Sequence, residues 1–299
     1  MSGPVLVGVD GSPASLEAVD AAAQEARRWG RSLRVVHAAT WPAMNVPFSA
    51  SSLTLPEGEI AQLANRTITE AVERARRAEP GLEVTEDVVT GEALAVLEAE
   101  SRTASLVVVG SRGLGGFTGL LLGSVAVHLS SHAACPVLVI RGQATPGGPV
   151  VLGADGSRDG DAAVRFAFAE ASMRGADLEA VHTWNNWTGP VTTTPGELAP
   201  LVYDVDMLRD EEERVLSQAV SGYQERYPEV TVRPRLENAR TRQALIKASE
   251  NAQLLVVGAR GRGGFTGLLL GSVSQAVLHH AHCPVAVVRR ISDTADDDE

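Results

Sequence analysis

Short apolar runs alternate along the chain with longer stretches in which apolar residues recur every three or four positions. The first run, residues 4–9, suits a strand buried on both faces. Ser12 and Pro13 then supply an N-cap and a first-turn proline for a helix that ends at Gly30. The same criteria predict further strands at residues 33–38, 82–89, 105–109 and 136–140, and helices at residues 59–79, 92–102 and 124–132.

This plan occurs twice. Residues 4–12 match residues 149–157, and later motifs are displaced by three further positions, so the second half carries a net insertion of three residues. Predicted strands follow at residues 150–154, 178–184, 230–236, 254–257 and 284–288, and predicted helices at residues 158–174, 204–227, 242–251 and 272–281. Five strands separated by helices in each half predict an α/β fold with a parallel sheet and right-handed crossovers.

The two halves are expected to be separate domains, residues 1–142 and 149–291, joined by a Gly- and Pro-rich linker at residues 143–148. Residues 40–57 and 185–202 lack periodicity and are predicted to be surface loops. Residues 292–299 form an acidic tail, for which disorder is expected.

Composition narrows the class of protein. The chain has 299 residues, 44% of them hydrophobic, which is ample for two cores. A formal net charge of -11 argues against a nucleic-acid partner, because phosphate backbones require a basic surface. No signal peptide and no run of about 18 apolar residues is evident, so a soluble cytoplasmic protein with no membrane partner is expected.

Each half carries a glycine-rich segment between its fourth strand and its last helix. Glycines at that place can present backbone N–H groups to a phosphate, although they also serve tight turns and helix ends. The segments read Gly110-Ser111-Arg112-Gly113, nine residues and Gly123-Ser124-Val125 in the first half, and Gly258-Ala259-Arg260-Gly261, nine residues and Gly271-Ser272-Val273 in the second.

These segments differ from two common phosphate loops. A Walker A loop needs a lysine against the phosphates, and the only lysine of the chain, Lys247, is far from both segments. The glycine spacing also departs from the dinucleotide fingerprint. Positive charge would come from Arg112 and Arg260, with Arg262 present in the second half only, unless these are solvated surface arginines.

A glycine and an aspartate end the first strand of each half. An interior glycine in a buried strand often marks the close approach of a ligand or another backbone. The aspartate can accept hydrogen bonds from ribose hydroxyls, or it can serve a turn ahead of the following serine. The residues are Gly8 and Asp10 in the first half and Gly153 and Asp155 in the second.

Histidines and cysteines suggest no catalytic or metal centre. His128 and His132 have metal-compatible spacing, but the repeat places Ala276 and His280 there, so a shared metal site is not expected. His37 and His182 close the second strand of each half and are expected to be packed or hydrogen-bonded. Cys135 and Cys283 occupy equivalent places and are expected to be buried free thiols.

Taken together, these residues resemble the universal stress protein family in its tandem two-domain form. The family signature, G-x2-G-x9-G-[ST], is matched in both halves, by Gly110, Gly113, Gly123 and Ser124 and by Gly258, Gly261, Gly271 and Ser272. The resemblance implies two Rossmann-like domains of the adenine nucleotide alpha hydrolase-like type. Each would hold a five-stranded parallel sheet in the order 3-2-1-4-5 with helices on both faces.

The resemblance also implies two ATP sites per chain, with Mg²⁺ accompanying the nucleotide. Asp10 and Asp155 would hold the ribose, the backbone near Ala38 and Thr183 would contact the adenine, and both glycine segments would bind the phosphates through N–H groups and hydroxyls. Hydrolysis would be slow or absent. The fifth strands resemble the family's dimerisation elements and could pair the two halves, pair chains, or both; a homodimer is expected.

Three functions remain open on the sequence. The first is a regulatory ATP-binding protein of the stress or dormancy response that acts on an unidentified protein partner. The second is a slow ATPase or nucleotidyl transferase of the same fold, suggested by arginines beside a phosphate site. The third is an interaction scaffold that nucleotide only stabilises.

Overall fold

In the computed structural model, the described residues are 3–39, 57–114, 122–184, 205–262 and 269–290. The predicted acidic tail, residues 40–56 of the first predicted loop and the whole of the predicted loop at residues 185–202 fall outside the described residues, as do the middles of both glycine segments. Residues 143–148 connect the halves: the N–H of Gln143 donates to His282 O and that of Thr145 to Ala252 O.

The first half alternates strands and helices as predicted, with boundaries shifted by at most two residues. Its elements are β1 (Val5–Gly8), α1 (Pro13–Trp29), β2 (Leu33–Ala39), α2 (Glu57–Ala78), β3 (Val84–Thr90), α3 (Ala93–Glu100), β4 (Leu106–Gly110), α4 (Ser124–His132) and β5 (Val137–Ile140).

The second half follows the same order. Its elements are β6 (Val150–Gly153), α5 (Asp161–Arg174), β7 (Leu178–Trp184), α6 (Val205–Gln224), β8 (Val232–Asn238), α7 (Thr241–Ala248), the short 3₁₀ turn η1 (Ser249–Asn251), β9 (Leu254–Gly258), α8 (Ser272–His280) and β10 (Val285–Val288). None of the helices in the described part of the chain is long and apolar enough to cross a membrane.

One predicted boundary was wrong by a full turn. We expected the helix after β6 to begin at residue 158, by analogy with α1, but α5 begins at Asp161. In α1, Ser12 caps the N–H of Ser15 and Pro13 occupies the first helical position. In the second half Ser157 instead binds the Asp155 carboxylate and the N–H of Gly160, and the helix starts after that turn.

The described strands form one sheet in the order β3-β2-β1-β4-β5-β10-β9-β6-β7-β8. Each half therefore has the predicted 3-2-1-4-5 order, and pairing is parallel within each half. The two halves meet where β5 and β10 pair antiparallel, with Leu138 opposite Ala286. The fifth strands thus pair the two halves with each other, which was one of the three alternatives left open by the sequence.

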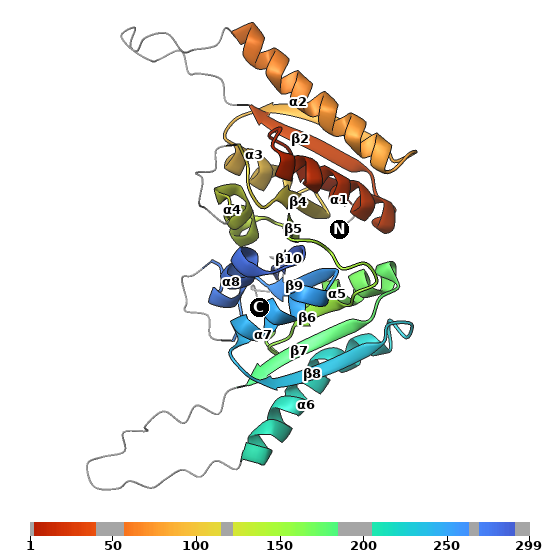
Figure 1. Ribbon diagram of the computed structural model, residues 1–299, viewed down its shortest axis with the longest axis vertical. Coiled ribbons are helices and arrows are strands. Elements are labelled where there is room, and N and C mark those ends of the chain that lie inside the picture. The colour runs from red at the N-terminus through yellow and green to blue at the C-terminus, as the bar shows by residue number, and fades with distance from the viewer. Residues whose placement is uncertain (1–2, 40–56, 115–121, 185–204, 263–268, 291–299) are drawn as a thin grey trace, which may run out of the picture.

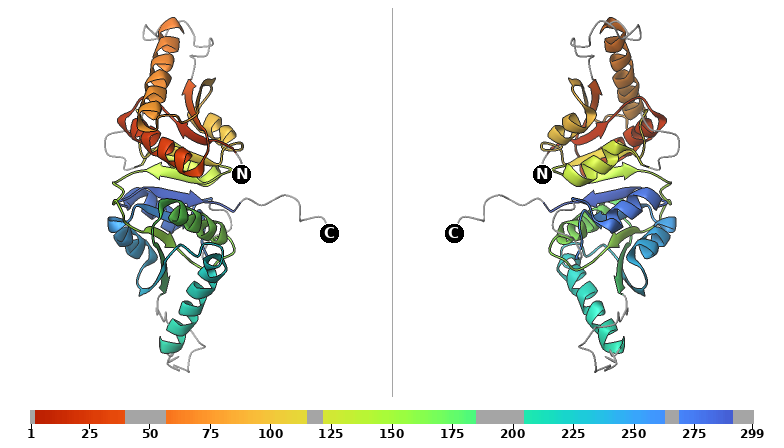
Figure 2. Two further views of the ribbon diagram at one scale, coloured as in Figure 1. Left: turned by 90° about the vertical axis from the view of Figure 1, so that its right-hand side faces the viewer. Right: turned by 90° about the vertical axis from the view of Figure 1, so that its left-hand side faces the viewer.

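Helices cover both faces of this sheet, as predicted. One apolar core lies under α1, α2, α5 and α6, and the other lies under α3, α4, α7 and α8. The molecule is elongated along the sheet, with β5 and β10 at its centre and α2 and α6 toward its ends (Figure 1). Viewed from the side, the two halves face each other across the β5–β10 seam (Figure 2).

One arginine from each half forms hydrogen bonds to the other half across the β5–β10 seam. Arg141, just after β5, donates from Nη1 to the carbonyls of Val277 and Leu278 near the end of α8. Arg289, just after β10, donates to the Ser131 carbonyl near the end of α4. Carbonyls at a helix C-terminus carry partial negative charge, so each half neutralises the last helix of the other.

A buried charge cluster also crosses between α1 and α5. Arg174 pairs with Glu170, with 2.8 Å between Nε and Oε2, and also with Glu25 of the other half. Trp29 Nε1 donates to Glu170 at 2.8 Å. Burial, followed by the neighbouring Glu25 charge, raises the pKa of Glu170 to about 7. The contact between halves therefore contains a carboxyl group that titrates near neutrality.

Candidate functional site

The glycine segments lie at the carboxyl ends of β4 and β9, where parallel sheets of this kind bind ligands. Each segment leaves its strand and returns to the start of the following helix. The N–H of Gly123 closes the first segment onto Ser111 O at 2.8 Å, and the N–H of Gly271 closes the second onto Ala259 O at 2.8 Å. Both segments therefore lead from the carboxyl end of a strand to the N-terminus of the following helix.

The helix N-termini at these segments have no capping side chain. Gly123 precedes α4 and Gly271 precedes α8, and neither offers a side-chain acceptor to the first turn. By contrast, α1 is capped by Ser12, whose Oγ accepts from the N–H of Ser15 at 3.2 Å. The first-turn N–H groups of α4 and α8 are thus available to an anion, which the helix dipole also favours.

An aspartate from the first strand holds each glycine segment. Asp10 Oδ2 accepts from the N–H of Leu114 at 2.7 Å, and Oδ1 accepts from the N–H of Ser12 at 3.0 Å. Burial acts to raise the pKa of Asp10, but the hydrogen bonds from Ser12 and Leu114 outweigh it and lower that pKa. The sequence left a turn role and a ligand role open for this residue; the turn contact is present, together with a bond to the loop.

The second half repeats this arrangement. Asp155 Oδ2 accepts from the N–H of Arg262 at 2.9 Å, and Oδ1 accepts from the N–H of Ser157 at 2.9 Å. Glycine is needed where loop and carboxylate meet, since a Cβ at Gly261 would lie 2.9 Å from Asp155 Oδ2 and one at Gly113 would overlap Asp10 Oδ2. The paired glycine and aspartate motifs, which are about 100 residues apart in the sequence, are thus in direct contact.

A cleft of about 500 Å³ lies beside Asp155 and the second glycine segment. Its volume is in the range of small-molecule sites. It brings together most of the second-half residues predicted from the sequence: Gly153, Asp155, Thr183, Gly258, Arg260, Gly261, Gly271, Ser272 and Val273.

Ala259 is the exception among the second-half predictions. It does not line the cleft, because its side chain is buried in the core under α7 and α8. Its backbone is still part of the segment, since its carbonyl accepts from Gly271.

The close neighbour of Gly8 and of Gly153 is a side chain, not the ligand or second backbone that the sequence analysis suggested. A Cβ at Gly8 would lie 2.7 Å from a Leu97 methyl group, and one at Gly153 would lie 3.0 Å from a Leu245 methyl group. The close approach is therefore that of a leucine from α3 or α7, rather than a second backbone. Gly153 and Leu245 both line the cleft, so this leucine shapes its apolar wall.

In the first half the predicted residues occupy equivalent places. Ala38 lies near the end of β2, Ser111 donates its N–H to Ile140 O at 3.0 Å, and Arg112 is exposed with its carbonyl 3.4 Å from Ser12 Oγ. Ser124 and Val125 form the first turn of α4.

Glu212 and Thr241 are cleft residues that the sequence analysis did not name, and His182 is one that it expected only to be packed or hydrogen-bonded. The ring of buried His182 has a partner at each nitrogen: Nδ1 lies 2.6 Å from Ala154 O, and Nε2 lies 2.6 Å from Glu212 Oε2. Glu212 also lies 3.5 Å from Arg262 Nη1. Thr241 completes the group, with its Oγ1 2.6 Å from Thr183 Oγ1. Glu212 and Thr241 belong to helices that carry no glycine motif, so only the fold brings them here.

The histidines and cysteines lie where simple packing would put them. His128 Nε2 is 2.7 Å from Glu98 Oε2, and its ring stacks on His132. His37 Nδ1 is 2.8 Å from Val9 O. Cys135 and Cys283 are free and buried, as expected, and burial raises the pKa of each thiol to about 12. In the described residues no group of three or more His, Cys, Asp or Glu side chains could hold a metal ion.

This pair of Rossmann-like domains, each with an aspartate-held glycine segment at the carboxyl ends of its strands, defines a tandem α/β protein. The family model for the Universal stress protein family matches residues 1–141 and 148–289. The chain therefore belongs to the universal stress protein family, in its tandem form.

Known relatives agree over the full length. The chain is 38% identical to Universal stress protein Rv1996 of Mycobacterium tuberculosis, over 97% of this chain and 96% of that protein. It is 39% identical to Universal stress protein Rv2005c of the same species, over 96% and 97%. A crystal structure of a universal stress protein from Archaeoglobus fulgidus shares the fold, with a TM-score of 0.69 at 20% identity, covering 98% of both chains.

Proposed function

We propose that this protein is a regulatory nucleotide sensor that binds one ATP in each half, at the two glycine segments. The observation that carries the proposal is the uncapped helix N-terminus beside an aspartate-held glycine loop, present in both halves. Such a loop offers backbone donors and a positive helix dipole to phosphate groups.

The other lining residues fit the remaining parts of a nucleotide. Leu245, Val257 and Thr183 line the same cleft, and the two apolar side chains could provide a surface for an adenine ring. Asp155 also lines the cleft, and its carboxylate could accept hydrogen bonds from ribose hydroxyls. By repeat equivalence, Asp10 and Ala38 would have the same roles in the first half.

Magnesium would enter with the nucleotide. Mg²⁺ usually binds through one or two carboxylates plus substrate phosphates and keeps several waters. The described residues offer no all-protein cage, which suits a metal carried mainly by the phosphates.

A sensor is favoured over an enzyme because the described cleft contains no arranged nucleophile and base. Its histidine, His182, has one ring nitrogen against a backbone carbonyl and the other against Glu212. Arg260 and Arg262 keep slow ATP hydrolysis or nucleotidyl transfer as the second candidate, because arginines can stabilise charge that develops on a phosphate.

The wider role follows as part of the same proposal. Nucleotide occupancy would change the affinity for a protein partner during stress or dormancy, in the cytoplasm, and the protein would act as a homodimer. Under the scaffold alternative, binding of that partner would be the same with and without functional glycine segments.

Calorimetry with MgATP on a matched pair of variants tests the proposal. Gly123 and Gly271 have ordinary extended backbone, and a Cβ at either position finds its nearest neighbour at 3.4 Å or more. The double variant Gly123→Asp/Gly271→Asp should fold, because aspartate is a favoured N-cap, yet its carboxylates would occupy the N–H groups and repel phosphate. The control, Gly123→Ala/Gly271→Ala, adds no charge and no cap.

The wild-type protein should bind two ATP molecules per chain, the alanine variant should retain binding, and the aspartate variant should lose it. A wild-type protein that binds no adenine nucleotide would overturn the proposal, as would equal binding by the aspartate and alanine variants. An ATP turnover assay on the same three proteins decides on the enzyme alternative: hydrolysis that the aspartate variant abolishes would favour it.

A further inference from the structure

A second hollow, separate from the nucleotide cleft, lies between α5 and α6 in the second half. This α5–α6 groove has a volume of about 930 Å³. It lies on the far side of the Asp155 turn from the cleft, and Asp155, Gly160 and Arg262 line both spaces and so form the wall between them. Nothing in the proposed nucleotide function uses this groove.

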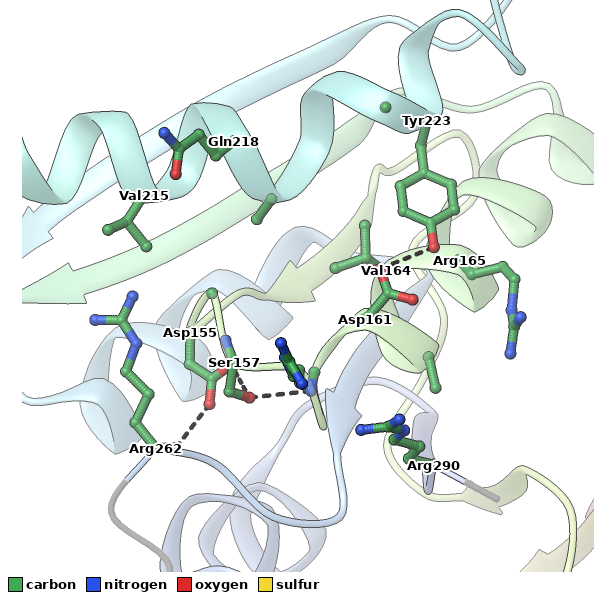
Figure 3. Close-up of a pocket in the computed structure, with 16 residues that line it drawn as sticks. Asp155, Ser157, Asp161, Val164, Arg165, Val215, Gln218, Tyr223, Arg262 and Arg290 are labelled. Atoms are coloured by element: carbon green, nitrogen blue, oxygen red, sulfur yellow. Dashed lines mark hydrogen bonds between the residues drawn. The ribbon is translucent and has the colours of Figure 1, made fainter. Parts of the chain in front are cut away.

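Four arginines line the groove: Arg158, Arg165, Arg262 and Arg290. They come from the Asp155 turn, from α5, from the second glycine segment and from the chain just after β10. Figure 3 shows Arg262 on one side of the turn that carries Asp155 and Ser157, and Arg165 and Arg290 on the other side. Among the described residues, no ion pair engages Arg158, Arg165 or Arg290.

The two aspartates of the groove are already hydrogen-bonded. Asp155 accepts from Ser157 and from the backbone of Arg262, and Asp161 accepts from the hydroxyl of Tyr223 at 2.9 Å (Figure 3). Four arginines against these two aspartates give the groove an excess of positive charge, in a chain whose net charge is -11.

A smaller hollow of about 350 Å³ extends this basic region. It shares Arg290 with the groove and adds Arg260 and Arg289, together with one carboxylate, Asp159. Burial, followed by the like charge of Arg260, lowers the pKa of Arg289. Such crowding of arginines is relieved by an anion, and a guanidinium group matches phosphate through two parallel hydrogen bonds.

The first half provides an internal comparison. The repeat aligns the four groove arginines with Pro13, Asp20, Leu114 and Gly142, none of which is basic. There, Asp20 of α1 pairs with Arg74 of α2, with 2.6 Å between Oδ2 and Nη2. In the second half the equivalent residues are Arg165 and Gly222, and both line the groove. The ion pair between the helices is therefore missing there, because an arginine takes the place of the aspartate and the glycine opposite has no side chain.

We propose that the α5–α6 groove is a binding site, present in the second half only, for a small anion that carries two or more phosphate groups. The groove is large enough for such a ligand, and its arginines are spread around it rather than gathered at one point, which suits several phosphates better than one. A free oligophosphate and the phosphate tail of a nucleotide share this chemistry.

The test uses inorganic tripolyphosphate as the probe, in calorimetry at fixed ionic strength. All proteins carry Gly123→Asp/Gly271→Asp, so that the two glycine segments are blocked; neither position lines the groove. The groove variant adds Arg165→Asp/Gly222→Arg, which reproduces the ion pair of the first half and should therefore fold. The matched control adds Arg76→Gln, an exposed arginine on α2 that changes the net charge by the same amount.

The blocked protein and the Arg76→Gln control should each bind one tripolyphosphate per chain, and the groove variant should bind it at least about tenfold more weakly. Inorganic phosphate should bind at least about tenfold more weakly than tripolyphosphate. In a second arm, ATP replaces tripolyphosphate: no ATP binding by the blocked protein, as the nucleotide test expects, identifies a free oligophosphate as the ligand, and ATP binding that the added Arg165→Asp/Gly222→Arg abolishes identifies the phosphate tail of a nucleotide.

The proposal fails if tripolyphosphate does not bind the blocked protein, or if the groove variant and the Arg76→Gln control bind it equally. This outcome is independent of the nucleotide proposal, which is measured on proteins with intact groove residues and depends on the glycine segments. Thermal unfolding of each variant, with a melting temperature close to that of the blocked protein, excludes misfolding as the cause of any loss.

Discussion

In the first half, an Asp20–Arg74 ion pair crosses between the two helices on one face of the sheet, whereas in the second half Arg165 lies across from a glycine. The surroundings of the glycine segments differ too. In the second half His182 contacts Glu212, which in turn lies 3.5 Å from Arg262. In the first half the residues equivalent to Glu212 and Arg262 are Ala64 and Leu114. The two halves therefore share a backbone and differ in the side chains around it.

What the halves share is informative about function. Both have the loop closure at the helix start, the uncapped helix N-terminus and the aspartate that accepts from the loop. These are backbone devices suited to phosphate. What differs lies mainly on α1, α2, α5 and α6, and at Leu114 and Arg262 within the glycine segment, so a second ligand can belong to one half alone.

The largest effect is expected at the seam between the halves. Arg141→Leu removes two charge-assisted hydrogen bonds to α8, and Arg289→Leu removes one to α4. Since such a bond contributes about 1.5–3 kcal/mol, urea denaturation should show a loss of about 3 kcal/mol for Arg141→Leu and roughly half that for Arg289→Leu. Arg76→Leu, on the exposed side of α2, serves as the control, and equal losses for Arg141 and Arg289 would contradict the described seam.

The next comparison is between the glycine segments. An alanine at Gly113 would overlap Asp10 Oδ2, while one at Gly261 would leave 2.9 Å to Asp155 Oδ2. Gly113→Ala should therefore weaken ATP binding at the first site by about tenfold, whereas Gly261→Ala should weaken the second by about threefold, because a neighbour can yield a few tenths of an ångström. Gly58→Ala, where a Cβ meets nothing within 4 Å, is the control for site-by-site calorimetry.

How far the sequence predicts this molecule depends on where the information lies. Hydrophobic runs and the repeat predict the strands, and the glycine and aspartate motifs predict most of the cleft, because each is a local pattern. The β5–β10 pairing stayed open, since an edge strand offers the same unpaired groups to its own chain and to another. Glu212 and Thr241 had no local signal at all.

The α5–α6 groove also escaped prediction, although a signal was present. Aligning the halves shows Asp20 and Arg74 opposite Arg165 and Gly222. That exchange has meaning only when α5 and α6 are known to lie side by side, which is a property of the packed sheet.

A third prediction concerns pH and the charge cluster between α1 and α5. Because burial raises the pKa of Glu170 to about 7, the folded state holds a proton that the unfolded state releases near pH 4.5. This contribution to stability is complete below pH 4.5 and is lost as pH rises through 7. Glu170→Gln removes the ionisation, so the variant should be more stable than the wild type at pH 8. The melting temperature there should rise by roughly 2–4 °C for each kcal/mol of recovered stability, and at pH 4 it should hardly change.

Differential scanning calorimetry from pH 4 to pH 8 would measure this change. The control is Glu213→Gln on the exposed side of α6, whose melting temperature should differ from that of the wild type by a constant amount across the range. A constant difference for Glu170→Gln as well would show that folding does not raise the pKa of Glu170.

The smallest effect is expected from Arg262→Leu, which gives the second cleft the residue of the first. Arg262 is exposed and shared between Glu212 and solvent, so its contribution to phosphate binding is modest. ATP affinity at the second site should fall by about threefold and approach that of the first, with no change at the first site. Tighter binding after the substitution would show that Arg262 serves the cleft only through Glu212.

The central claim is that each half binds a nucleotide through its glycine segment, and the stoichiometry of MgATP binding tests it most directly. Calorimetry on the wild-type chain and on the single variants Gly123→Asp and Gly271→Asp should give two, one and one ATP per chain. A wild-type value of zero, or the same value for all three proteins, would contradict the claim.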